Sequence, residues 1–259
     1  MDSTLRIITT GVIAQQRNLD TIANNLANVH TPGFKRARVE FKDLPYYGPG
    51  QAEAGEGWAR LVEGSEGEGV RINATQLLFG QGPLEETQNP LDLALDGPGF
   101  FAVQMPDGTT AYTRNGNFTL DQSGRIVSHD GLPLSPEIEV PTGATDVQVD
   151  SQGVVWAKVG DGEPQKVGQI TIARFANPEG LAPIGHSLFV PTVASGEATS
   201  VRAGTPGQAN LHPRMIEGSN VDLGDEMTRL IQAQRAYQLG LQALRVWDEL
   251  ASRATNVRR

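Results

Sequence analysis

The sequence predicts an α+β protein, with N- and C-terminal helices pairing as a coiled-coil-like domain and an all-β domain between them. Three observations lead to this prediction. Apolar residues recur at three- and four-residue steps near both ends of the chain, which is the spacing of an amphipathic helix. Between the ends, glycine-containing turn signals recur at short intervals, which is typical of antiparallel strands. A stretch rich in glycine and glutamate lies between the first helix and the strands.

The first predicted helix covers residues 3–30. Its apolar residues occupy every a and d position of a heptad repeat except one, which holds Gln15. A sustained 3.5-residue period indicates a helix that packs along another helix, and at ~1.5 Å per residue this one would be roughly 40 Å long. Pro32 and Gly33 end it. The apolar set is Leu5, Ile8, Val12, Leu19, Ile22, Leu26 and Val29.

The C-terminal end of the chain repeats the pattern from residue 223 onward. Ser219 and Asn220 are suited to cap the first turn, and Gln234 is a polar exception within the apolar row. Each helix has a narrow apolar seam, so the two are expected to form an antiparallel pair that neighbouring subunits complete. The apolar row consists of Met227, Leu230, Tyr237, Leu241, Leu244 and Ala251.

The chain between the helices divides into two parts. Residues 48–69 contain seven glycines, five glutamates and a single basic residue, so they cannot bury enough apolar surface to order themselves alone. From about residue 70, Asp107-Gly108, Asn115-Gly116, Ser123-Gly124 and Asp130-Gly131 supply hairpin-turn signals. The prediction is a discontinuous helical domain of residues 1–45 and 213–259, a linker segment of residues 46–70 and an all-β domain of residues 71–212.

Composition and residue spacing argue against several classes of function. A net charge of −9 disfavours nucleic-acid binding and docking on an anionic membrane, and the lack of cysteine excludes disulfides and thiolate metal sites. No run approaches the ~18 apolar residues of a membrane-spanning helix. The four histidines lie far apart, and the aspartates of the central region lie beside or just before glycines, as in turns. We therefore expect no catalytic, cofactor or metal site.

Five motifs, in order along the chain, resemble those of the flagellar rod and hook protein family. They are Ile22-Ala23-Asn24-Asn25-Leu26-Ala27-Asn28-Val29 with Thr31-Pro32-Gly33-Phe34-Lys35-Arg36, Asn89-Pro90-Leu91-Asp92-Leu93-Ala94-Leu95, Tyr112-Thr113-Arg114-Asn115-Gly116, Ser219-Asn220-Val221-Asp222 and Gln234-Arg235-Ala236-Tyr237. Within this family, the chain length and the segment inserted at residues 41–70 are similar to those of the distal-rod type. The alternatives are a proximal-rod subunit and a short hook-type subunit.

The resemblance implies a structural subunit and no enzyme. Such a subunit would polymerise with copies of itself into a rigid tubular drive shaft that transmits torque from motor to hook. It would contact other rod and hook subunits and the ring proteins that surround the rod. It would be exported by the flagellar type III apparatus and would reside in the periplasmic rod of the basal body.

The expected subunit-interface residues are the apolar seams together with several amides. Gln15 and Gln234 either tolerate a seam edge or fix the register of subunit contacts, since a buried amide needs a hydrogen-bonding partner. Asn24, Asn25 and Asn28 are poor helix-interior residues, which favours amides bonded to adjacent helices over a solvated face.

A basic cluster follows the first helix. Lys35, Arg36 and Arg38 either favour the carbonyl end of that helix or pair with acidic loops, such as residues 53–68, of a neighbouring subunit. The second interpretation would make these three residues linker contacts.

Overall fold

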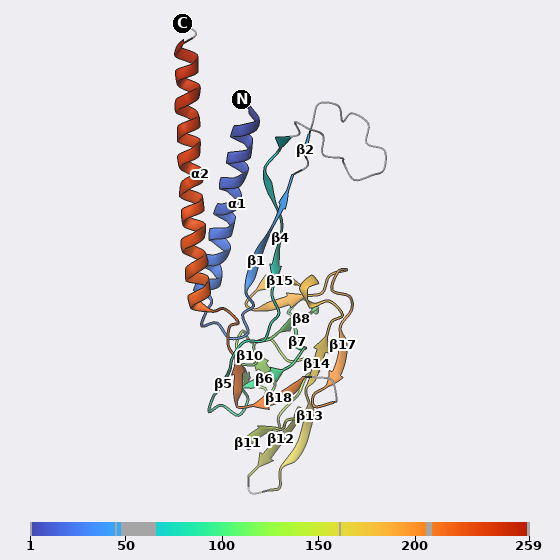
Figure 1. Ribbon diagram of the computed structural model, residues 1–259. Helices are drawn as coiled ribbons and strands as arrows, with labels where there is room; N and C mark the ends of the chain where they lie inside the picture. Colours follow the sequence, from blue (N-terminus) through green and yellow to red (C-terminus); the bar gives the residue numbers. More distant parts are fainter. Residues whose placement is uncertain (1, 45, 48–65, 161, 206–208, 258–259) are drawn as a thin grey trace. The chain divides into compact units, whose positions relative to one another are not determined.

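The computed structural model describes residues 2–44, 46–47, 66–160, 162–205 and 209–257 (Figure 1). The chain forms two compact units. We call the first, Met1–Ala27, Ala37–Leu77 and Asp222–Arg259, the helical unit. The second, Asn28–Arg36 and Leu78–Val221, is the β unit. The chain therefore passes between the units at four places in the sequence.

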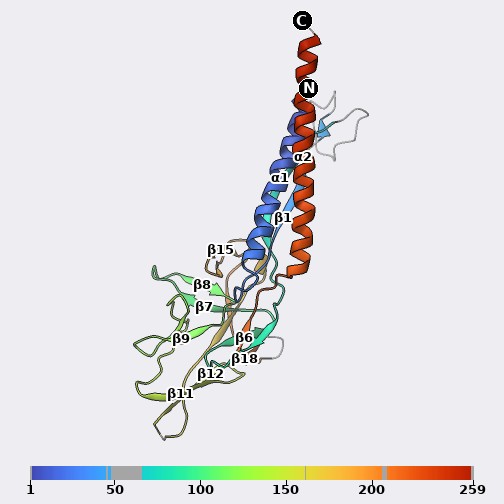
Figure 2. The ribbon, with the colours of Figure 1, turned by 90° about the vertical axis from the view of Figure 1, so that its left-hand side faces the viewer.

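The helical unit is built on two helices and a long strand pair. α1 (Asp2–Ala27) and α2 (Leu223–Val257) run antiparallel and lie side by side (Figures 1 and 2). α1 also packs against β1 (Ala37–Asp43) and β4 (Val70–Leu77), which form an antiparallel ladder. β2 (Tyr46–Tyr47) and β3 (Glu66–Gly67) pair beyond it. α1 thus lies between α2 and the strands, so it is covered on two sides (Figure 1).

The helix ends differ from the sequence expectation. α1 stops at Ala27, so Asn28 and Val29 lie in the turn that follows it. α2 starts at Leu223, and its N-cap is Asp222, whose Oδ1 accepts a hydrogen bond from the Asp225 amide at 2.9 Å. The predicted caps were therefore wrong: Ser219 bonds the Val221 amide at 3.3 Å, before the helix begins.

Strands β1 and β4 were not anticipated beside the helices. Short runs with mixed polarity carry a weak strand signal, and only their pairing reveals them. A β-bulge at Asn73 of β4 lies opposite the step from Glu40 to Phe41, so Thr75 opposite Val39 and Ile72 opposite Phe41 lie on one face of the ladder. Val39 is buried, whereas Phe41 is 44% exposed. The residues of the other face include Arg38, Lys42 and Arg71, all of which are exposed.

The β unit contains the predicted central all-β region. Its largest sheet has six strands in the order β15-β16-β8-β7-β14-β17. These strands are β15 (Ala182–Gly185), β16 (Leu188–Val190), β8 (Thr110–Thr113), β7 (Phe100–Gln104), β14 (Thr171–Arg174) and β17 (Thr199–Arg202). A three-stranded sheet joins β11 (Ala144–Val149), β12 (Val154–Val159) and β13 (Gln165–Gln169).

Three short strand pairs and a 3-10 turn complete the described part of this unit. β9 (Phe118–Leu120) pairs with β10 (Ile126–Ser128), β6 (Leu93–Asp96) with β18 (Asn210–Pro213), and β5 (Leu84–Glu86) with β19 (Met215–Glu217). The turn covers Pro178–Gly180. A large apolar cluster fills much of the interior, and it includes Phe101 and Phe118, which meet edge to face with 5.1 Å between the ring centroids.

The predicted turns hold with one exception. Asp121 is a turn residue whose side chain accepts hydrogen bonds from the amides of Ser123 and Arg125. Asn115-Gly116, in contrast, is no hairpin turn, because β8 and β9 belong to different sheets. Glycine is needed there for space, since a Cβ atom at Gly116 would lie 1.6 Å from the Leu93 carbonyl oxygen.

Candidate assembly site

The contact between α1 and α2 brings together part of each predicted seam. On α1, Ile22 is buried, and the remaining seam members within the helix are half-buried: Leu5, Ile8, Val12, Gln15, Leu19 and Leu26. On α2, Leu230, Tyr237, Leu241 and Leu244 are half-buried. Met227 and Gln234 are exposed, although the heptad pattern placed them in the seam.

The α2 seam consists of two alternating rows of residues. The row that was predicted to contain Met227 and Gln234 lies one residue earlier in the structure. Its members are Glu226, Ala233, Gly240 and Trp247. Ala233 is 4% exposed, and a Cβ atom at Gly240 would lie 2.6 Å from Cγ2 of Val12. Small side chains thus let the helix backbones approach closely. A search for large apolar residues misses such positions, so the heptad pattern placed Met227 and the polar exception Gln234 in this row instead.

Asn25 connects α1 to both of its neighbours. Its amide nitrogen donates to the Ala37 carbonyl at 2.8 Å and to Oε2 of Glu226 at 3.3 Å, and its oxygen accepts from the Ala37 amide at 2.9 Å. Asn25 and Glu226 are each 1% exposed. An amide bonded to an adjacent helix was expected, but the partner lies in the same chain. Asn25 is therefore not available to a neighbouring subunit, which corrects its assignment as an interface residue.

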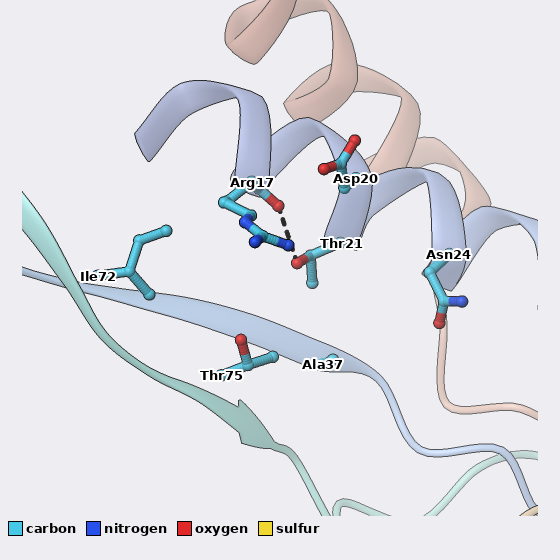
Figure 3. A pocket seen from close by; sticks show the side chains of 7 residues that line it. All are labelled: Arg17, Asp20, Thr21, Asn24, Ala37, Ile72 and Thr75. Carbon is cyan, nitrogen blue, oxygen red and sulfur yellow. Dashed lines mark hydrogen bonds between the residues drawn. The ribbon is translucent and has the colours of Figure 1, made fainter. Parts of the chain in front are cut away.

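The other two asparagines have different surroundings. Asn28 accepts a hydrogen bond from the Thr31 hydroxyl at 3.2 Å. Asn24 is exposed and borders an open pocket between α1 and the strand pair (Figure 3). The lining residues are Arg17, Asp20, Thr21, Asn24, Ala37, Ile72 and Thr75. No group of three or more His, Asp or Glu residues suited to a metal occurs in the described part of the chain.

A row of large apolar side chains on α2 is left uncovered. Leu239, Val246 and Leu250 are 64%, 56% and 60% exposed, and their spacing of seven and four residues places them on one side of the helix. That side lies roughly 100° around the helix from the row that contains Ala233 and Gly240. Nearer the start of α2, Leu223, Met227 and Ile231 are each 49% exposed. α2 therefore has more apolar surface than α1 covers.

Lys35 lies in a different environment from the one expected. Its Nζ donates to Oε1 of Glu217 at 2.6 Å and to the Gly80 carbonyl at 2.8 Å, and neither charged side chain has any exposed surface. Burial lowers the pKa of Lys35, and the Glu217 carboxylate opposes this shift. Burial likewise lowers the pKa of Arg114, which bonds Oε2 of Glu217 at 3.1 Å. Lys35 is thus an internal residue of the β unit and not a contact for a neighbour's loop.

The two arginines of the same cluster remain nearer the surface. Arg38 pairs with Glu40 at 2.7 Å, and both side chains are exposed. Arg36 is half-buried, and its backbone amide donates to Oδ1 of Asn220 at 2.7 Å. The acidic segment proposed as their partner lies mostly outside the described residues. Within the described part, Glu68 pairs with Arg6 in the helical unit.

Sequence comparison identifies the protein's relatives. Models of the flagella basal body rod protein, the flagellar hook protein FlgE/F/G D1 domain and the flagellar basal body rod FlgEFG protein C-terminal match residues 5–35, 94–157 and 212–257. The flagellar basal-body rod protein FlgG of Agrobacterium fabrum is 42% identical over 256 residues, which cover 96% of both chains. That of Caulobacter vibrioides is 40% identical over 98% of both chains. The chain belongs to the FlgG family.

Membership of the FlgG family makes this chain a structural subunit of the flagellar distal rod, located in the basal body. The match extends to FlgG of Bacillus subtilis, which is 37% identical over 94% of both chains. FlgF of Mesorhizobium japonicum is more distant, at 31% identity over 92% of this chain. In the described residues of this FlgG-family chain, no helix has the length and apolarity needed to cross a membrane.

In the described part of the chain, four buried charged residues escaped the sequence reasoning: Asp92, Arg114, Glu217 and Glu226. Each interrupts an apolar pattern, so periodicity alone treats it as a surface residue. A signal existed for Arg114, which lies inside one of the five motifs, and for Glu217, which lies two residues before another. A charged residue in or beside such a motif could have been predicted to be buried and paired with another charge.

Proposed function

We propose that the FlgG-family chain polymerises with copies of itself into a helical tube that transmits torque from the motor to the hook. Helical units would form the inner part of the tube, and β units would form the outer part. The observation that carries this proposal is the uncovered apolar row of Leu239, Val246 and Leu250. Large exposed apolar patches typically mark contact sites. Neighbouring copies would cover this row and so complete the burial that α1 begins.

In this proposal α1 and α2 pair as a coiled-coil-like element within each subunit. The observed α2 seam supports it, because its members follow one another at alternating steps of four and three residues from Glu226 onward. Contacts between subunits would then use the side chains that the α1–α2 pair leaves exposed. Met227 and Gln234 on α2 and Asn24 on α1 are suited to this role. Gln15 would fix the register of these contacts.

A second subunit contact involves the outward face of the strand pair. Lys42 and Arg71 lie directly opposite each other on adjacent strands. Two like charges in this position repel each other and destabilise the strand pair unless an anionic group lies nearby. Arg38 and Glu40, which pair with each other, are on the same face, so the face keeps a net positive charge from Lys42 and Arg71. In the β unit acidic residues clearly outnumber basic ones. We therefore assign the acidic surface of a neighbouring β unit as the partner of this basic face, with the linker segment 46–70 bridging the subunits.

The remaining parts of the proposal follow from the family. The chain would be exported by the flagellar type III apparatus and would assemble in the periplasm. Its other partners would be further rod and hook subunits and the ring proteins. It would act without cofactor or catalysis, and neither nucleic acid nor membrane insertion would be involved.

The test is a double substitution, Leu239→Asn with Leu250→Asn, expressed in a strain that lacks the natural protein. We expect soluble, folded subunits and basal bodies whose rods stop short in electron micrographs. The matched control is Gln238→Asn with Gln242→Asn, which changes exposed polar positions of the same helix. Full-length rods in the double variant would overturn the assignment of this row as a subunit contact.

A further inference from the structure

Three segments that are far apart in the sequence meet inside the β unit. They are residues 28–36, 78–82 and 217–221, and each adjoins a place where the chain passes to or from the helical unit. Lys35, Arg114 and Asn220 lie in three of the five motifs, and Glu217 lies just before one of them. Assembly through the helices and the strand pair does not account for these residues.

Glu217 is the centre of this meeting point. Its Oε1 accepts hydrogen bonds from Nζ of Lys35 at 2.6 Å and from the Gly82 amide at 2.9 Å, so one oxygen joins the other two segments. Its Oε2 accepts from Arg114, next to β8, at 3.1 Å. Its backbone carbonyl accepts from the Gly33 amide at 2.8 Å. Glu217 thus links its own segment to residues 28–36, to residues 78–82 and to Arg114 in the body of the β unit.

Asn220 makes a second set of links among the same segments. Its Oδ1 accepts from the Arg36 amide at 2.7 Å, and its Nδ2 donates to the carbonyls of Leu78 at 2.7 Å and Gly80 at 3.0 Å. The Leu78 amide also donates to the Arg36 carbonyl at 2.8 Å. Every pair of the three segments is therefore joined by hydrogen bonds.

The buried charges of Lys35, Arg114 and Glu217 restrict how the three segments can be arranged. Arg114 is almost as buried as Lys35 and Glu217, so two cations share one carboxylate without solvent. Arg114 also donates to the Gly97 carbonyl at 2.7 Å, and its guanidinium lies 5.3 Å from the centre of the Phe100 ring. A buried ion pair adds little stability over an apolar contact, but it is strongly disfavoured in any other arrangement. Apolar contacts would permit slippage, whereas these bonds permit one register.

We propose that Glu217, Lys35 and Asn220 form a clamp that holds the connecting segments in one register, so that force passing between the two units is shared among all of them. These are positioning residues. The clamp itself stands on the contacts within the β unit, and only its mechanical consequence rests on the proposed function. Without the clamp, the three segments would not be joined to one another, and the force would act on them one at a time.

The first test is Lys35→Met in the full-length protein, followed by amide hydrogen exchange. Methionine fills similar space and leaves Glu217 paired one to one with Arg114, so the β unit should still fold. We expect the amides of Leu78 and Gly82 to exchange about tenfold faster or more, while those of β7 and β8 keep their protection. The matched control is Arg125→Met, which removes only exposed ion pairs in the same unit.

A second variant, Glu217→Gln, keeps the shape but leaves two buried cations without their carboxylate. We expect faster exchange at Gly33 as well as at Gly82. Unchanged exchange at Gly82 and Leu78 in both variants would overturn the clamp. So would equal loss of protection across β7 and β8 in both variants, because the cluster would then be part of the general core.

A third measurement tests the mechanical consequence in cells. Lys35→Met should give rods of normal length but swimming that slows more steeply with medium viscosity than in the Arg125→Met control. Equal swimming at every viscosity would overturn the sharing of force. The exchange results do not depend on polymerisation, so failure of the proposed function would be recognised separately, by the rod lengths of the α2 variants.

Discussion

The two units differ in how completely each buries its own apolar surface. In the β unit a large apolar cluster is buried, with Phe101, Leu95 and Val103 fully inaccessible. The described buried apolar residues of the helical unit are Ala14, Ile22, Val39 and Ala233. Both units expose large apolar side chains, but those of the helical unit, on α1, β1 and α2, accompany few buried ones. The β unit is therefore a self-contained domain, while the helical unit has the surface of a component that other molecules complete.

The largest expected effect is a core deletion in the β unit. Phe101→Ala removes a fully buried ring and should lower the free energy of unfolding of this unit by ~3–5 kcal/mol. Denaturant unfolding can be followed by the fluorescence of Trp156 in β12, in a background where Trp58 and Trp247 are replaced by phenylalanine. A loss below about 1 kcal/mol would show that the cluster is not the core of the β unit.

The matching change in the helical unit is Phe41→Ala, which removes the same ring at a position that is 44% exposed. It should cost no more than about 1 kcal/mol in the isolated subunit, because surface substitutions have small effects. Circular dichroism of the helices would report it. A cost as large as that of Phe101→Ala would contradict the contrast between the units.

The next effect concerns the polar centre of the helical unit. Asn25→Leu removes the hydrogen bonds to Ala37 and Glu226, and it should destabilise the α1–α2 pair by ~1–3 kcal/mol, measured by thermal loss of helicity. Asn24→Leu is the natural control, since it changes the exposed asparagine one position earlier. Equal effects of the two changes would mean that Asn25 does not hold the helices and strand together.

Close helix packing at Gly240 gives a smaller effect. Gly240→Ala adds a Cβ atom 2.6 Å from Val12, so steric conflict of ~1–3 kcal/mol should outweigh the ~1 kcal/mol gain in helix propensity. Adding Val12→Ala should restore stability beyond the sum of the single changes. Gly224→Ala, where the nearest atom is 3.4 Å away, should raise helix stability instead. Hydrogen exchange of α2 amides measures each variant.

The smallest effect is the pH dependence of a turn in the β unit. Backbone hydrogen bonds from Arg125 and Ser123 hold the pKa of Asp121 below its usual value. A carboxyl whose folded-state pKa is depressed adds stability above its unfolded pKa of ~3.9, and that stability is lost as pH falls through the folded value. Asp121→Asn should therefore be slightly less stable than the natural protein at pH 7, with the difference vanishing in strong acid. A pH-independent difference would contradict this cause.

Sequence patterns predicted the elements with strong local signals. Both helices were foreseen because their apolar residues recur over many turns, and the central strands because glycine turns separate them. The candidate site was only partly foreseen. Leu230 and Tyr237 lie where the heptads put them, but Ala233 and Gly240 carry no hydrophobic signal, although they set the distance between the helices.

By itself the sequence determined local conformation, because periodicity, caps and turns depend on residues a few positions apart. It also determined family membership, through motifs that are contiguous in the chain. Tertiary structure alone decided which charges are internal. Lys35 and Glu217 are 182 positions apart, and each looks like a surface residue in its own neighbourhood. Burial of a charge depends on a partner brought close by folding, and no local pattern records that distance.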